Sequence, residues 1–244
     1  MVMIERALYA AKSSNWLIIV SGFVEPVLYL MAFGFGIGQL IGDIQDGNGN
    51  PVSYAAYIAP ALLATSAMNG ALYDATWNVF FKMHFGKIYN GMLSTSMGTL
   101  DVALGEIGWA LLRGLSYAIG FMAIVTPLGL IPSAWGILAI PAAVLIAFGF
   151  ASFGMAVTSY MKSFQQLELV SVFLLPMFLF SGSFYPLSVF PEWLQTVIRL
   201  FPLAHAIDLV RGLTLGNISW ALVGHAMYFV VMIVVGLFFT TKRL

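Results

Sequence analysis

The sequence predicts an all-α membrane protein with six transmembrane helices and both termini in the cytoplasm. Composition is the first reason: of 244 residues, 61% are hydrophobic and only 8% are Asp, Glu, Lys or Arg, whereas a soluble domain carries about 25% charged residues. The mean hydropathy is +0.95. In addition, the apolar residues fall into long runs, and basic residues favour alternate loops between those runs. Such a composition excludes a soluble enzyme, a nucleic-acid-binding protein and a disordered chain.

Six apolar runs are each long enough to cross the hydrocarbon core, which takes about 20 helical residues. They are Leu17–Ile41, Ser53–Phe81, Glu106–Ile131, Ala134–Thr158, Leu167–Leu187 and Trp220–Phe239. Pro26 should kink the first run, and Pro176 interrupts the fifth, because proline removes a backbone hydrogen bond. The runs use most of the chain, so we expect one transmembrane domain over residues 1–244 and no separate soluble domain.

Small residues spaced four apart indicate close helix packing in two of the runs. Gly34 and Gly38 share one face of the first run, and Ala143, Ala147 and Ala151 share one face of the fourth. Such faces let helices approach closely, either within one subunit or between two subunits. Packing within the subunit is the commoner case.

The N-terminal segment Met1–Ser14 mixes apolar side chains with Glu5, Arg6 and Lys12. This spacing suits a helix that lies in the membrane interface with its apolar face toward lipid. A cytoplasmic tail is an equally good interpretation. The apolar run that follows is too long for the central region of a cleaved signal peptide.

Loop charges predict the orientation, because Lys and Arg concentrate in loops that remain in the cytoplasm. Seven basic residues lie in the two termini and in the second and fourth loops: Arg6, Lys12, Lys82, Lys87, Lys162, Lys242 and Arg243. The fifth loop, on the opposite side, contains Arg199 and Arg211. Both termini are therefore expected inside the cell. In a bacterium the membrane would be the cytoplasmic (inner) one.

Three charged residues lie inside the predicted runs: Glu25, Asp74 and Arg113. At the rise of a helix, each lies about 10–12 Å from the cytoplasmic end of its run. A charge at such a depth is costly and usually has a partner within the protein. We therefore expect Arg113 to pair with Asp74 or Glu25. The pair would either order the bundle or line an inward-facing cavity.

The second loop contains the segment Lys82–Leu93, which mixes basic and large apolar residues with two glycines. A short amphipathic helix here would present Phe85, Ile88 and Tyr89 to another protein. The alternative is an interfacial loop that its aromatic residues anchor on lipid. The candidate docking residues are Lys82, His84, Phe85, Lys87, Ile88 and Tyr89.

The fifth loop is long and still apolar, and prolines divide it into two short helices. Pro191 suits the first turn of a helix reaching Phe201, and Leu203–Leu215 forms a second helix that Gly216 ends. Both are too short to cross the membrane. We expect re-entrant or interfacial helices that cover the outer mouth of the bundle, where protein or water must satisfy any irregular backbone.

Polar residues of this outer region form a second set of candidates. His205, Asp208 and Arg211 recur on one face of the second short helix, where Asp208 and Arg211 can pair. A structural pairing is the expected role. The candidate residues are Trp193, His205, Asp208 and Arg211.

Motifs for chemistry within the chain itself are scarce. There is no Cys, no glycine-rich phosphate loop and no His-Glu-x-x-His zinc motif, so no metal site or bound cofactor is predicted. One observation would suit an enzyme: Ser116 lies in the third run and His225 in the sixth. An intramembrane serine protease needs a Ser and a His on neighbouring spans. An ATP-independent secondary transporter or channel is the other alternative, although the two halves do not match as inverted repeats would.

Four stretches carry a resemblance to a known family. They are Glu25–Gly34 (EPVLYLMAFG), Ala59–Ala64 (APALLA), Pro176–Gly182 (PMFLFSG) and Phe201–Gly212 (FPLAHAIDLVRG). In their order and spacing, and in the plan of six spans with both ends inside, the chain resembles the permease subunit of type-2 ABC transporters. It is most similar to the branch of bacterial nodulation-factor and drug exporters, over nearly the whole chain.

This resemblance implies an export permease rather than an enzyme. Two permease subunits, as a homodimer or a heterodimer, would form the pathway in the lipid bilayer, and a separate ATP-binding cassette subunit would hold ATP and Mg²⁺. The loop Lys82–Leu93 would contain the coupling helix that docks on the ATPase. Met1–Ser14 would be the interfacial connecting helix, and the short helices between Pro186 and Gly216 would cap the exit. The transported substrate is left open.

Overall fold

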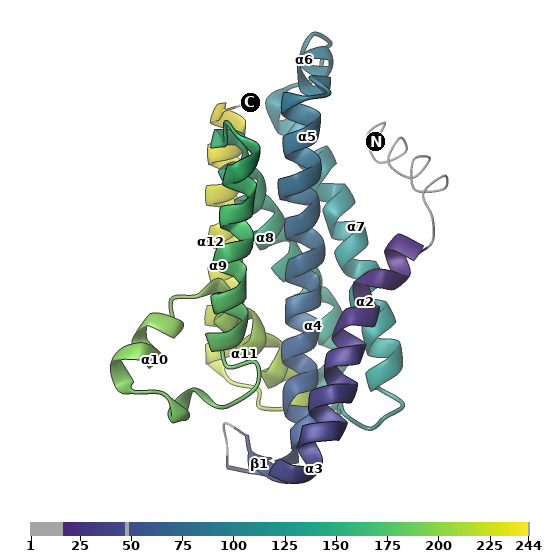
Figure 1. Ribbon diagram of the computed structural model, residues 1–244, viewed down its shortest axis with the longest axis vertical. Coiled ribbons are helices and arrows are strands. Elements are labelled where there is room, and N and C mark those ends of the chain that lie inside the picture. Colours follow the sequence, from purple (N-terminus) through teal and green to yellow (C-terminus); the bar gives the residue numbers. More distant parts are fainter. Residues whose placement is uncertain (1–16, 47–48, 244) are drawn as a thin grey trace.

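The computed structural model describes residues 17–46 and 49–243, with their side chains except those of 17–21 and 23. The predicted interfacial segment Met1–Ser14 lies outside these residues. Within the described part the chain is mostly helical, and its long helices run side by side along one axis (Figure 1). The architecture agrees with the predicted all-α membrane protein.

The long helical segments follow the predicted apolar runs. They are α2 (Leu17–Tyr29) with η1 (Leu30–Ile37) and α3 (Gly38–Ile41); α4 (Tyr54–Tyr73) with η2 (Asp74–Asn78) and α5 (Val79–His84); α7 (Thr99–Val125); η3 (Ala134–Leu138) with α8 (Ala139–Tyr160); α9 (Phe164–Phe180); and α12 (Trp220–Arg243). Within the described residues, five segments are long and apolar enough to cross a membrane. The remaining apolar helix, α9, has 17 residues.

Shorter elements lie in the connections. They are β1 (Asp43–Gln45) and β2 (Pro51–Ser53), which pair as an antiparallel hairpin, and α6 (Ile88–Leu93), η4 (Leu187–Val189), α10 (Glu192–Ile198) and α11 (Pro202–Leu215). The two short helices predicted in the fifth loop are therefore present as α10 and α11. Gly216 ends α11 with a φ of 85°, a left-handed conformation that suits glycine.

The third predicted run, Glu106–Ile131, is placed too far along the chain. In the structure it is α7, which already begins at Thr99 because Asp101 caps its first turn: the Gly98 N–H donates to the Asp101 carboxylate at 2.9 Å. The helix ends at Val125; Thr126 still has helical backbone, and Pro127, which follows it, has no N–H to continue the helical hydrogen bonds. Charged residues at its start hid this part of the helix from a search for apolar runs.

The fifth predicted run, Leu167–Leu187, is too long at its C-terminal end. The helix α9 ends at Phe180, where Gly182 adopts a φ of 76° and turns the chain away. Pro176 lies inside α9 without ending it.

Pro26 disturbs the first run in a specific way. Proline has no N–H to donate to the carbonyl of the residue four positions earlier, which is Gly22. The Ser66 hydroxyl of α4 donates to that carbonyl instead, at 3.1 Å. Beyond this point the helix widens into the π-helical segment η1 before it becomes α-helical again.

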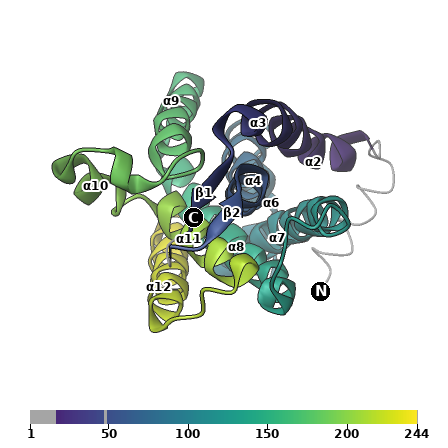
Figure 2. The same cartoon turned by 90° about the horizontal axis from the view of Figure 1, so that it is seen from below.

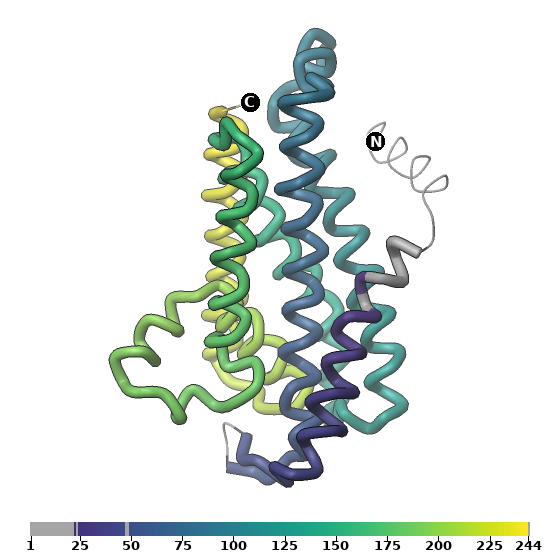
Figure 3. Tube along the Cα trace, viewed as in Figure 1, coloured from purple at the N-terminus to yellow at the C-terminus, as the bar shows by residue number. Residues whose placement is uncertain are grey.

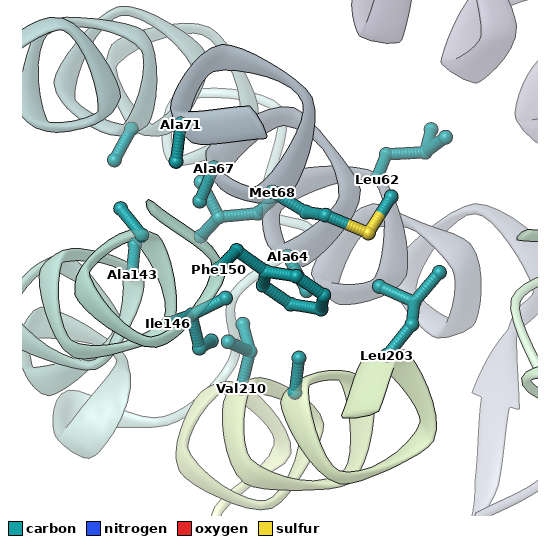
Figure 4. Packing of buried hydrophobic residues seen from close by; sticks show 14 of the residues in the cluster. Leu62, Ala64, Ala67, Met68, Ala71, Ala143, Ile146, Phe150, Leu203 and Val210 are labelled. Atoms are coloured by element: carbon teal, nitrogen blue, oxygen red, sulfur yellow. The ribbon is translucent and has the colours of Figure 1, made fainter. Parts of the chain in front are cut away.

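The central helix of the bundle is α4. Viewed along the bundle, it is surrounded by the other long helices (Figure 2), and it packs against α7, α8 and α11. Its many fully buried alanines, such as Ala64 and Ala67, let these neighbours approach closely. Figure 4 shows the resulting core, in which Phe150 of α8 lies among side chains of α4 and α11.

The small residues noted in the sequence serve packing within the subunit. A Cβ atom on Gly34 would meet Ala55 of α4 at 3.3 Å. In α8, Ala147 lies 3.0 Å from the place where a Cβ atom on Gly114 of α7 would stand. Ala143 and Ala151 are likewise fully buried. These faces join helices of one chain.

The two ends of the bundle differ (Figure 1). One end carries α6, which projects beyond the other helices, and the C-terminal end of α12; we call it the α6 end. The opposite end carries α3, the hairpin and the C-terminal end of α11; we call it the hairpin end. Figure 3 traces how the chain leaves α9 near this end, swings outward through η4 and α10, and returns as α11.

Large apolar side chains cover the outer faces of α9 and α12. Examples with 57–69% exposure are Val172 and Phe173 of α9 and Val231, Val234 and Phe238 of α12. An exposed apolar surface of this extent indicates contact with lipid or with another protein.

Candidate functional site

Two ion pairs join the α4–α5 segment to α7. The Arg113 Nε atom lies 3.0 Å from Asp74 Oδ2, and the two side chains are only 13% and 3% exposed. Nearer the α6 end, Lys82 Nζ lies 2.6 Å from Glu106 Oε2. The Asn78 amide donates to the other carboxylate oxygen of Asp74. We call these five side chains the charge ladder.

Helical spacing places the ladder on facing sides of its two helices. Asp74, Asn78 and Lys82 recur every four residues along η2 and α5, and Glu106 and Arg113 lie seven apart on α7, so each set shares a face. A buried charge without a partner is strongly destabilising, so pairing and the Asn78 amide allow these residues to remain inside the bundle.

The predicted pairing of Arg113 is confirmed with one of its two proposed partners, Asp74. The other, Glu25, has an exposed side chain and belongs to no ion pair within the described part of the chain. Sequence reasoning missed Asn78 and Glu106, although Asn78 lies one helical turn after Asp74 and so had a signal in its spacing.

The segment between α5 and α6 is exposed at the α6 end. Phe85 is 69% exposed, and Lys87 follows it in a left-handed turn with a φ of 45°. On α6 itself, Asn90 and Gly91 are exposed. We call Phe85, Lys87, Asn90 and Gly91 the α6 tip.

Other candidates from the predicted docking loop face inward, which corrects the sequence-based expectation. Tyr89 is only 2% exposed and belongs to the apolar core, so it cannot be presented to a partner. Ile88 is half-buried. The ring of His84 stacks on Phe80 at 4.3 Å between centroids, and Lys82 belongs to the charge ladder. On a helix as short as α6, the sequence did not show which face meets α7.

At the hairpin end, Arg211 fixes α11 to the rest of the bundle. Its Nη2 atom donates to the Gly182 carbonyl at 2.9 Å and its Nε atom to the Tyr57 carbonyl at 3.4 Å. The guanidinium also lies 3.9 Å from the centre of the Tyr57 ring, a cation–π distance. The predicted pair with Asp208 is present at 3.9 Å, but Asp208 is 44% exposed, so it is the weaker contact.

A second contact of α11 was not predicted from the sequence. The Nδ1 atoms of His205 and His225 lie 2.7 Å apart, within hydrogen-bond distance. Burial, and next the imidazole of His225, lower the pKa of His205 from its usual 6.5, while Asp208 acts in the opposite direction. The two histidines lie on different elements, so nothing in their spacing indicated the contact. Trp193, on α10, is 69% exposed and faces away from the protein.

The protease alternative finds no support in the geometry. The Ser116 hydroxyl donates to the Leu112 carbonyl of its own helix at 2.8 Å, and His225 contacts His205. Among the described residues, no three His, Cys, Asp or Glu side chains are grouped so that they could hold a metal ion.

Comparison with known proteins then identifies the family. Residues 1–215 match the family described as "ABC-2 type transporter". The chain belongs to this family. ABC-2 proteins that it resembles include Nodulation protein J of Rhizobium leguminosarum bv. trifolii, 30% identical over 221 residues, which cover 90% of this chain and 82% of the relative.

Two further ABC-2 relatives support the same conclusion. Nodulation protein J of Sinorhizobium fredii is 32% identical over 79% of this chain and 72% of its own length. The inner membrane transport permease YadH of Escherichia coli is 30% identical over 78% of this chain and 73% of its own length. The chain is therefore a multi-pass transmembrane permease of the ABC-2 family, as its resemblance implied, and its function is transport.

Proposed function

We propose that this chain is the membrane-spanning subunit of an ATP-driven exporter and that it couples to a separate ATP-binding cassette subunit. Its family supports a transport role, and the relative named YadH is called an inner membrane transport permease. The chain has no glycine-rich phosphate loop of its own. ATP and Mg²⁺ would accordingly bind the partner, and a second permease subunit would complete the pathway.

The proposed topology has six crossings, with α9 as the fifth. At the helical rise, its 17 residues extend about 25 Å, close to the thickness of the hydrocarbon core. With six crossings both termini lie on one side, and Lys82, Lys87, Lys162, Lys242 and Arg243 gather there. We therefore assign the α6 end to the cytoplasm of a bacterial cell and the hairpin end to the outer side.

The observation that carries the docking proposal is the α6 tip. The helix α6 extends farthest from the bundle at this end (Figure 1), and the tip offers an exposed aromatic ring near a cation. Buried aromatic anchors are typical of energetically dominant contacts between proteins. We assign Phe85 as the anchor in the ATPase and Lys87 as an accessory contact. Tyr89 would support α6 from inside.

The charge ladder connects this tip to the centre of the bundle. The tip follows α5, which is continuous with η2 and α4, and the ladder fixes α5 and η2 to α7. Movement of the docked tip would therefore move two helices together rather than bend α5 alone. ATP binding can shift the permease only as far as it favours one state over another.

Co-purification with a candidate ATP-binding cassette subunit from the same bacterium tests the proposal. The Phe85→Ala variant should lose at least about tenfold in affinity for the ATPase, the size expected for an aromatic anchor. Phe173→Ala on α9 is the matched control, since Phe173 is also 69% exposed but lies far from the tip; it should retain the ATPase. Equal retention by both variants would contradict the docking assignment.

A second measurement tests whether ATP is hydrolysed by the ATPase and not by this chain. The purified chain should not hydrolyse ATP alone, and transport should stop when the ATPase is removed. ATP hydrolysis by the isolated chain, or uphill transport driven by a proton gradient without the ATPase, would overturn the proposed function.

A further inference from the structure

The contact between His205 and His225 is one of the polar contacts between the first turn of α11 and α12. The two Nδ1 atoms lie 2.7 Å apart. The Tyr228 ring stacks on the His205 ring with 4.2 Å between centroids, and the Tyr228 hydroxyl donates to the Leu200 carbonyl at 3.3 Å. The stacked Tyr228 ring fixes the orientation of the His205 ring in this contact.

Beside its apolar packing on α4 and α8, α11 has a second polar attachment six residues further along, at Arg211. Its partners are the carbonyls of Tyr57 and Gly182 and the Tyr57 ring. An arginine stays charged throughout the pH range of proteins and carbonyls do not titrate, so this attachment does not change with pH. The two ends of α11 are thus held by contacts of different chemistry.

Proton counting shows when the histidine contact can exist. With both rings neutral, one Nδ1–H donates to the unprotonated Nδ1 of the other ring. One added proton leaves a single imidazolium that still donates to a neutral Nδ1, so the contact persists. A second proton places an N–H on both facing atoms and a positive charge on both rings. No acceptor then remains, and the two charges repel.

We propose that the His205–His225 pair is a proton-operated latch: it holds the start of α11 on α12 while at most one ring is charged, and it releases this part of α11 when both rings are protonated. Arg211 stays attached and serves as the pivot. The proposal concerns the chain itself and holds whether or not the chain works with an ATPase.

Surrounding groups define the direction of the pH response. On α11, Asp208 favours the charged form of His205, whereas burial and His225 oppose it. Backbone groups at Arg199 also bond His205, and α12 contributes Tyr228. From α4, the Tyr57 ring lies beside Arg211. The helix α8 contains no Asp, Glu, Lys, Arg or His.

The sign of the response follows from the lowered pKa of His205. A released His205 takes up a proton near its usual pKa of 6.5, and the latched residue does so only at lower pH. The latched form is therefore fully favoured above about pH 6.5 and loses this advantage as the pH falls below that value.

Distances between spin labels on the full-length chain in liposomes test the latch. The chain contains no Cys, so labels attach only at introduced positions. Leu200→Cys, 71% exposed just before α11, and Phe238→Cys, 59% exposed on α12, report the separation of the two elements. Between about pH 8 and about pH 5, the range in which histidine titrates, a second and longer distance should replace most of the first.

Matched variants separate the latch from a general effect of acid. His225→Asn, whose amide stands near the position of Nδ1 without gaining charge, should abolish the shift, and His205→Asn should do the same. His84→Asn should leave the shift intact. The pair Ile119→Cys and Phe238→Cys, on α7 and α12, should show one distance at both pH values.

Two outcomes would overturn the proposal. One is a Leu200–Phe238 distance that stays the same across the pH range in the labelled chain with both histidines in place. This measurement does not depend on whether a histidine variant folds. The other is the same shift in the native chain and in His225→Asn, which would place the titrating group elsewhere.

Discussion

The charge ladder and the contacts of α11 solve the same problem, the attachment of one helix to another inside an apolar bundle, in opposite ways. The ladder places acidic groups against basic groups, with Asp74 and Arg113 almost completely buried. The α11 contacts place a cation on carbonyls and a ring at Arg211, and two imidazole rings against each other at His205. The ladder therefore holds the α6 end by pairs of opposite charges, whereas the hairpin end contains a contact between two histidines that protons can remove.

This comparison predicts that breaking the ladder has the largest effect on stability. Arg113→Leu leaves the Asp74 carboxylate buried without its counter-charge, and it should cost about 3–5 kcal/mol, as for other broken buried pairs. Thermal unfolding of the purified chain in detergent, followed by the amount of monodisperse protein, measures the loss.

The double variant Asp74→Leu with Arg113→Leu distinguishes lost charge pairing from lost side-chain shape. Because it leaves no buried charge, it should recover most of the stability. Glu25→Gln is the control for a charge in a spanning helix that is exposed and lies outside the ladder, and it should have little effect. If Arg113→Leu unfolds at the native temperature, the ladder does not hold the bundle.

The hairpin end should respond less strongly to the loss of its permanent contact. Arg211→Lys keeps the charge but loses the planar group that stacks on Tyr57 and reaches two carbonyls at once. We expect a cost of about 1–3 kcal/mol, seen as faster amide hydrogen exchange over Pro202–Leu215 but not over α7.

Asp208→Asn is the matched control for Arg211→Lys. It removes the 3.9 Å pair with Arg211, whose acidic partner is 44% exposed, and should cost less than about 1 kcal/mol. Exchange in α11 that is equally fast in both variants would mean that the Asp208 pair, rather than the carbonyl and ring contacts, holds the helix.

The sequence was informative where one-dimensional patterns carry the physics. Apolar runs located the long helices of the bundle, since lipid forces backbone hydrogen bonds within each segment. The cost of a buried charge pointed to a partner for Arg113, and helix-ending residues located α10 and α11. Its main error in bounds, at α7, arose because the capped and charged first turn of a membrane helix is not apolar.

Contacts between elements were beyond such patterns. Glu25 and Asp74 had similar predicted depths, and only the rotation of each helix decides that Asp74 faces Arg113 while Glu25 is exposed. The same rotation buries Tyr89 and leaves Phe85 exposed. His205 and His225 meet because α11 folds back onto α12, which no local spacing indicates.

The smallest expected effect concerns the Lys82–Glu106 pair of the charge ladder. It compares the loss of the acidic partner with the loss of the basic partner. Lys82 is 29% exposed and Glu106 only 7%. Glu106→Gln leaves a lysine whose long side chain can turn toward water, and it should cost no more than about 1 kcal/mol. Lys82→Met leaves a buried carboxylate without its cation and should cost more, on the order of 1–2 kcal/mol. Unfolding temperatures of the two variants give the order directly. If Glu106→Gln is the more destabilising change, the Lys82–Glu106 pair stabilises the bundle mainly by holding Lys82 at the base of the α6 tip, and not by neutralising the Glu106 carboxylate.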